Sequence, residues 1–115
     1  MHVAALLAST VISFGRTGGN ILPFAVSVSQ TGAVTTSGPV SAPKAIPVAA
    51  VNGLLTLARA ERFAALPRRV ACKGVLPDVA SLYITIAGRT VTVHGACNRQ
   101  FSELYAVLQA VAVTG

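Results

Sequence analysis

Two stretches in which apolar and polar residues alternate constrain the fold of this chain most. In ILPFAVSVSQTG (residues 21–32) every second residue from Phe24 to Val28 is apolar, and the same period of two returns in SLYITIAGRTVTVHG (residues 81–95). This spacing is typical of β-strands that bury one face and expose the other. Thr31-Gly32 and the AGR segment predict hairpin turns. The chain therefore favours an antiparallel sheet with one covered face.

The remaining segments predict a further pair of strands and two helices. Alternation from near Leu6 to Gly19 indicates a first strand, and AVTTSGPV is interpreted as the return strand of a three-stranded meander. The apolar spacing from Val48 to Arg62 is helical, RFAALP adds one turn, and Asn98 is a good N-cap for a closing amphipathic helix. The segment RRVACKGVLPDVA between the helix and the second hairpin is interpreted as a loop.

This order of elements, β-β-β-α-β-β-α, predicts the α+β class. We expect a two-layer sandwich with a mainly antiparallel sheet of about five strands and both helices on one face. The 115 residues are sufficient for one hydrophobic core, so a single domain over residues 1–115 is expected.

The two cysteines predict a disulfide. Cys72 precedes the first strand of the second hairpin and Cys97 follows its second strand, and antiparallel pairing brings those two ends together. The spacing fits neither a CxxC redox pair nor a zinc site. A bond that closes a loop of about 25 residues stabilises a protein by about 3 kcal/mol in the chain-entropy model and implies an oxidising compartment. Two buried free thiols are the alternative.

The chain shows no pattern of a membrane span or of an export signal. The uncharged stretch from Thr17 to Pro43 is interrupted by Gly, Ser, Thr, Gln and Pro, and no window of eighteen residues is continuously apolar. The first apolar run lacks a basic region before it and is a poor signal peptide. With the disulfide, these features predict a protein of the cell envelope or a secreted one, with the export signal absent from this chain.

Basic residues outnumber acidic residues nine to three, which gives a formal net charge of +6. Five of them lie close together in the sequence and form a candidate patch for acidic lipid or polymer: Arg59, Arg62, Arg68, Arg69 and Lys73. A solvated helix end and loop is the ordinary interpretation of such a run. Nucleic acid is not an expected partner, because no RNP-like cluster of aromatic residues accompanies the basic ones.

No arrangement of residues predicts catalysis. The three acids, Glu61, Asp78 and Glu103, are dispersed over a helix end, a loop and the polar face of the last helix, so they do not predict paired carboxylates. His94 lacks neighbours that would complete a metal site, and no serine lies in a nucleophile elbow. We therefore expect a non-enzymatic protein without metal or cofactor.

The segment ISFGRTGGN (residues 12–20) ends the first strand in an arginine and two glycines. A phosphate cradle requires a helix N-terminus after the glycines, whereas here a strand follows. The glycines instead supply positive φ or close backbone approach at a turn. The remaining candidate role is a sheet-end loop that binds another protein, formed by Arg16, Thr17, Gly18, Gly19 and Asn20.

The order of these motifs resembles a diffuse group of small bacterial proteins that includes the emfourin-like inhibitors of thermolysin-like metallopeptidases. The likeness is carried by RTGG, the QTG turn, RFAALP, the PDVASLYITIAGRTVTV stretch and the closing helix. It implies a binding protein without an active site, whose sheet-end loops occupy the cleft of a metallopeptidase. The sequence departs from that group after Gly19, where Asn20-Ile21-Leu22-Pro23 replaces an aromatic and further small residues, and in its cysteine pair.

Overall fold

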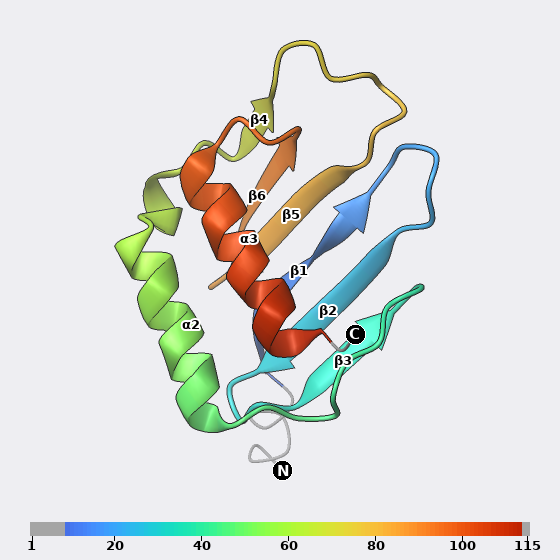
Figure 1. Ribbon diagram of the computed structural model, residues 1–115. Coiled ribbons are helices and arrows are strands. Elements are labelled where there is room, and N and C mark those ends of the chain that lie inside the picture. Colours follow the sequence, from blue (N-terminus) through green and yellow to red (C-terminus); the bar gives the residue numbers. More distant parts are fainter. Residues whose placement is uncertain (1–8, 114–115) are drawn as a thin grey trace.

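Residues 9–113, which the computed structural model describes, form a six-stranded sheet with both α-helices packed on one of its faces (Figure 1). The strand order is β3-β2-β1-β5-β6-β4, so β3 and β4 are the edges. Every neighbouring pair is antiparallel except β4 and β6, which are parallel. The strands are β1 Thr10–Thr17, β2 Phe24–Ser29, β3 Val34–Ser37, β4 Arg69–Ala71, β5 Ser81–Ile86 and β6 Arg89–His94. The helices are α2 Val48–Ala60, the 3-10 turn η1 Phe63–Ala65 and α3 Arg99–Ala112.

The predicted α+β class and the order of the main elements are confirmed, with one strand more than expected in the described part of the chain. The added strand is β4, which lies in the segment interpreted as a loop and pairs with β6. Strand β2 begins at Phe24 rather than at residue 21, because Pro23 has no N–H to donate to the ladder. The expected start of the first strand near Leu6 lies outside the described residues.

The core lies between the sheet and the two helices, and Phe14 is at its centre. Phe14 is fully buried on β1, with Val26 opposite it on β2 and Ile84 opposite it on β5. Its ring meets the ring of Tyr105 edge to face, with centroids 5.7 Å apart, and Tyr105 stacks on Phe101 at 5.9 Å. These aromatic contacts fix α3 to the central strand.

Tyr105 also makes a polar contact with the sheet. Its hydroxyl donates a hydrogen bond of 3.1 Å to the carbonyl oxygen of Gly15, the residue that follows Phe14 on β1. Burial raises the pKa of Tyr105 to about 12, because the phenolate would lose its hydration in this position.

We expect this shift to be directly measurable in the variant Tyr83→Phe, which leaves Tyr105 as the single tyrosine in a chain without tryptophan. The tyrosinate absorbance of the folded variant should titrate well above pH 10, because burial of Tyr105 is the main cause of the shift, although the smaller contribution of Tyr83 to the raised pKa is lost in this variant. An unfolded tyrosine ionises at about pH 10, whereas the buried Tyr105 of the folded protein stays protonated to a higher pH. The free energy of unfolding is therefore unaffected by this group below about pH 10 and falls as the pH rises above it towards the pKa of the folded state. Tyr105→Phe should abolish this part of the pH dependence. Titration of Tyr105 at pH 10 would contradict the buried position.

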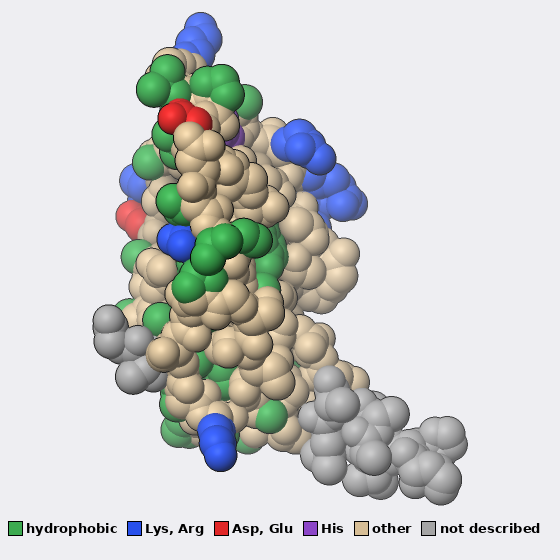
Figure 2. Space-filling view, turned by 90° about the vertical axis from the view of Figure 1, so that its right-hand side faces the viewer, with side chains coloured by type: hydrophobic (Ala, Val, Ile, Leu, Met, Phe, Trp, Pro, Cys, Tyr) green, Lys and Arg blue, Asp and Glu red, His purple; other side chains and the backbone are tan. Residues whose placement is uncertain are grey.

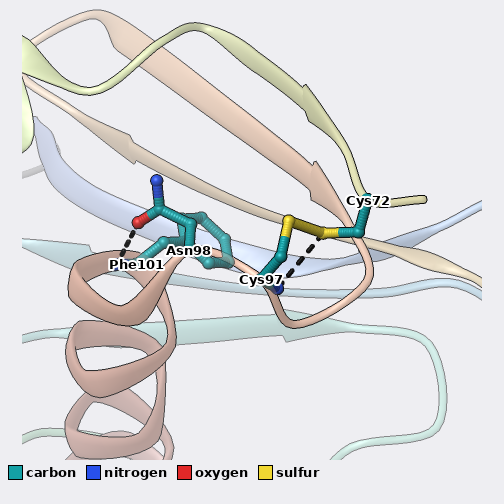
Figure 3. The surroundings of a disulfide bond; sticks show 4 residues. All are labelled: Cys72, Cys97, Asn98 and Phe101. Atoms are coloured by element: carbon teal, nitrogen blue, oxygen red, sulfur yellow. Dashed lines mark hydrogen bonds between the residues drawn. A yellow bond between two sulfur atoms is a disulfide. The ribbon is translucent and has the colours of Figure 1, made fainter.

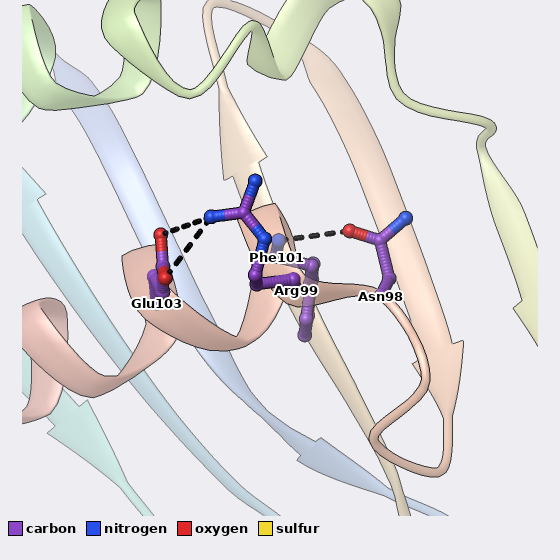
Figure 4. A network of polar contacts seen from close by, with 4 residues as sticks. All are labelled: Asn98, Arg99, Phe101 and Glu103. Carbon is purple, nitrogen blue, oxygen red and sulfur yellow. Dashed lines mark hydrogen bonds and ion pairs between the residues drawn. The ribbon is translucent and has the colours of Figure 1, made fainter.

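Helix α3 begins at the predicted cap (Figure 4). The side-chain oxygen of Asn98 accepts a hydrogen bond of 2.9 Å from the backbone N–H of Phe101. In the first turns of the helix, Arg99 and Glu103 form an exposed ion pair at 3.3 Å, which contributes little to stability. A hydrogen bond between the carboxyl groups of Glu61 and Glu103 raises the pKa of Glu61 and lowers that of Glu103. The carboxyl group of Glu61, which directly follows α2, therefore lies near that of Glu103 on α3.

Candidate binding site at the sheet-end loops

The predicted disulfide between Cys72 and Cys97 is present, with 5.8 Å between the two Cα atoms (Figure 3). It joins the residue after β4 to the segment between β6 and α3. The backbone N–H of Cys97 also donates to Sγ of Cys72 at 3.1 Å. Gly95 has a φ of 116°, and a Cβ there would lie 2.6 Å from Cβ of Cys72, so only glycine leaves room for the bond. The disulfide anchors the start of the β4–β5 loop.

The far part of the β4–β5 loop is a turn held to β6. The N–H of Val79 donates to the carbonyl oxygen of Leu76 at 3.1 Å, with Pro77 at the position where its fixed φ suits a turn. The Nε2 atom of His94 lies 2.9 Å from the carbonyl oxygen of Val79. Because a carbonyl oxygen can only accept, Nε2 carries the hydrogen in this contact. His94 thus fixes the loop.

The β1–β2 loop lies against this turn. The backbone N–H of Asn20 donates to the carbonyl oxygen of Asp78 at 3.0 Å, and the two side chains approach within 3.5 Å. Gly19 has a φ of 71°, and a Cβ there would lie 2.6 Å from the backbone nitrogen of Ala80. The second glycine of the RTGG segment is therefore the point at which the two loops touch.

The residues predicted to form a protein-binding loop have two different roles in the structure. Arg16 folds back, because its Nε donates to the carbonyl oxygen of Leu22 at 2.9 Å and its guanidinium lies 5.0 Å from the centre of the Phe24 ring. It closes the base of the loop instead of projecting from it. The other four, Thr17, Gly18, Gly19 and Asn20, are exposed.

Four large apolar side chains project from the two loops, and we name them the apolar tip: Ile21, Leu22, Leu76 and Val79. Their exposed fractions are 51%, 69%, 65% and 47%. Figure 2 views this side of the molecule and shows hydrophobic side chains on its surface, close to basic ones. Together with Arg16, two of the four, Ile21 and Val79, line a hollow of about 490 Å³ between the loops.

The sequence interpretation missed the apolar tip. The alternating stretch 21–32 extends the predicted strand over Ile21 and Leu22, although Pro23 directly follows them. A proline ends the hydrogen-bonded ladder, so apolar residues before it lie outside the sheet and lose the cover of the core. Pro77 beside Leu76 is a similar signal in the other loop. Apolar residues next to a loop proline therefore indicate exposed hydrophobic side chains here.

The basic residues of the predicted acidic-surface patch are divided among three places. Arg59 and Arg62 line a cleft at the end of α2, Arg68 and Arg69 lie at the start of β4, and Lys73 follows the disulfide. Among the described residues the single ion pair is that of Arg99 with Glu103, so none of these five side chains has an acidic partner.

The contact at Gly19 leads to a prediction with a matched control. Gly18 also has a positive φ, 74°, but no atom would approach a Cβ there within 4 Å. Gly18→Ala should therefore cost about 1 kcal/mol from backbone strain alone. Gly19→Ala should cost a further 1–3 kcal/mol from overpacking. Urea unfolding and hydrogen exchange at the Asn20 amide measure this difference. Equal losses and equal exchange in the two variants would contradict the contact between the loops.

Metal binding, membrane insertion and known relatives give no further guidance to function. Within residues 9–113, no group of three or more His, Cys, Asp and Glu side chains could hold a metal ion. No helix in this range is long and apolar enough to cross a membrane. No protein family model matches the chain, and no curated protein and no solved structure shows significant similarity to it.

Proposed function

We propose that this chain is a non-catalytic binding domain that recognises a protein partner through the apolar tip. The observation that carries this proposal is the exposure of four large apolar side chains on two adjacent loops. The polar residues Thr17, Asn20 and Asp78 of the same two loops are exposed beside them. Apolar surface with a polar rim is typical of protein interaction sites, in which a few central side chains supply most of the binding energy.

The loops are held in place before any partner binds. The disulfide, the bond of His94 to Val79, the bond of Asn20 to Asp78 and the bond of Arg16 to Leu22 each fix one part of them. A segment that is already fixed loses little conformational entropy on association. This arrangement favours specific binding over a loop that orders only in the complex.

The shape of the molecule favours a concave partner. The protein is elongated, with extents of 48 × 29 × 26 Å, and the two loops project at one end of the sheet (Figure 1). A projecting apolar loop suits the substrate cleft of a peptidase, and the resemblance to emfourin-like inhibitors supports a metallopeptidase as the partner. In this proposal the disulfide belongs to an oxidising compartment, so the protein acts in the cell envelope or after secretion.

Substitution of Leu22 tests this function. We expect the native chain to inhibit a thermolysin-like metallopeptidase competitively and Leu22→Asp to weaken inhibition about tenfold or more, as for a central interface residue. The matched control is Val48→Asp, which places the same charge on a 50% exposed valine at the start of α2, away from the tip. Inhibition constants from substrate competition give the result.

Two outcomes would count against the proposal. Absence of inhibition across a panel of metallopeptidases would exclude this class of partner. Equal loss of inhibition in Leu22→Asp and Val48→Asp would show that the tip is not the contact surface. Salt-sensitive retention on anionic vesicles, lost in the double variant Arg68→Ala/Arg69→Ala, would instead favour the alternative function of an accessory domain that binds acidic surfaces.

A further inference from the structure

A second hollow lies away from the apolar tip, where the end of α2 meets the β5–β6 hairpin. It is a cleft of about 650 Å³ between the last turns of α2, η1 and the turn of the β5–β6 hairpin. This volume is within the range of small-molecule sites, which is roughly 300–1,000 Å³. Its apolar lining comes mainly from Leu55, Ala58, Phe63 and Ile86.

Three arginines surround this apolar lining, and no acidic residue contributes to it. Arg59 and Arg62 come from the end of α2, while Arg89 comes from the start of β6. Glu61 lies between the first two in the sequence, but it does not line the cleft. The cleft is therefore positively charged without an internal counter-charge.

Arg89 is held at the edge of the cleft by a backbone contact. One of its terminal nitrogens donates to the carbonyl oxygen of Leu66 at 2.6 Å. Its Nε atom is buried and has no hydrogen-bond partner. Arg59 is partly fixed as well, since a terminal nitrogen donates to the hydroxyl of Thr56 at 3.2 Å.

The backbone is strained on both sides of the same cleft. Among the described residues, two that are not glycine have positive φ, Arg62 at 58° and Ala87 at 52°, and both line the cleft. This conformation costs about 1–2 kcal/mol for a residue with a Cβ. Arg62 directly follows the C-cap of α2, and Ala87 with Gly88 forms the two-residue turn of the β5–β6 hairpin, so helix end and hairpin turn fix the backbone on both sides of the cleft.

From these observations we infer that the cleft binds a single-chain amphipathic anion, a fatty acid. Its alkyl chain would lie on the accessible part of the apolar lining at Leu55, Ala64 and Ala87, and its carboxylate would accept hydrogen bonds from Arg59 and Arg62. Carboxylates match the paired donors of a guanidinium group. A hydrophilic polyanion would satisfy the arginines but would leave Leu55, Ala64 and Ala87, the accessible apolar residues of the cleft, in water. The combination of lining and charge therefore favours a ligand with one anionic head and one apolar chain.

The test uses dodecanoate below its micelle concentration, with binding measured by calorimetry and the site located by amide chemical shifts. Ala64→Phe should abolish binding, because Ala64 is exposed and lines the cleft, so a ring there fills its entrance. Ala65→Phe is the matched control, since Ala65 is exposed on the same turn and does not line the cleft. This control should bind as the native chain does.

Charge is tested separately from shape. Arg59→Gln and Arg62→Gln should each weaken dodecanoate binding about threefold to fivefold, which is the size of an exposed ion pair. Arg68→Gln removes the same charge outside the cleft and should leave binding unchanged. Dodecanol, which has the same chain without the charge, should bind more weakly to the native protein than dodecanoate does.

Three results would each overturn the inference. The first is absence of dodecanoate binding to the native chain, and the second is equal binding by Ala64→Phe and Ala65→Phe. The third is equal affinity for dodecanol and dodecanoate. None of these results depends on inhibition of a peptidase, so this site and the apolar tip are tested independently.

Discussion

Replacement of Phe14 by alanine is expected to lower the free energy of unfolding by about 3–5 kcal/mol, the usual loss for a fully buried phenylalanine. The ring of Phe14 is inaccessible to solvent and packs edge to face on Tyr105. On the neighbouring strands β2 and β5 it is flanked by Val26 and Ile84. Alanine would leave a cavity that the surrounding strands cannot close. Since domains of this size have a total stability of about 5–15 kcal/mol, the variant should lose a large part of it.

Urea unfolding followed by circular dichroism gives the measurement for Phe14→Ala. The control is Val107→Ala on the outer side of α3, where the side chain is 38% exposed, and its loss should stay within about 0.5 kcal/mol. A loss below about 1 kcal/mol for Phe14→Ala would contradict a core centred on this ring.

Removal of the disulfide should have the second largest effect. The double variant Cys72→Ala/Cys97→Ala opens a loop with a sequence separation of 25 residues, and we expect a loss of about 3 kcal/mol. The reason is that the unfolded chain gains freedom when the link is absent. Hydrogen exchange in the β4–β5 loop should also become faster, because the disulfide anchors one end of that loop.

Chemical reduction of the native chain provides the matched comparison for this double variant. Reduced protein and Cys72→Ala/Cys97→Ala should unfold at similar urea concentrations, and reduction should add the mass of two hydrogens. Free thiols in the unfolded, unreduced protein would contradict the bond. Equal stability of the native chain and the double variant would show that the link does not constrain the unfolded chain.

Much of this fold could be predicted because its longest elements carry local signals. Alternation in β2, β5 and β6 and the Asn98 cap of α3 are visible within a few residues of sequence. Strand β4 has only three residues, too few for a period of two to appear, and its partner β6 begins twenty residues after β4 does. Its existence depends on tertiary pairing and not on a local pattern.

The candidate sites were less predictable, because they depend on contacts between distant segments. Arg16 was expected to project towards a partner, but the path of the loop brings the carbonyl oxygen of Leu22 and the ring of Phe24 within its reach. The cleft required Arg89 to join Arg59 and Arg62, which happens only when the second hairpin packs beside α2. Side chains that meet through packing leave no spacing in the sequence to recognise.

The two edges of the sheet bear on how this protein behaves at high concentration. Strand β4 is three residues long and is preceded by Pro67 and Arg68, so it offers a short, charged template for another chain. At β3, the N–H of Val34 donates to the carbonyl oxygen of Lys44 at 2.9 Å, so the chain covers part of this edge itself. Gly38 and Pro39 end the strand soon after. Both edges therefore oppose strand addition between molecules and the aggregation that follows from it.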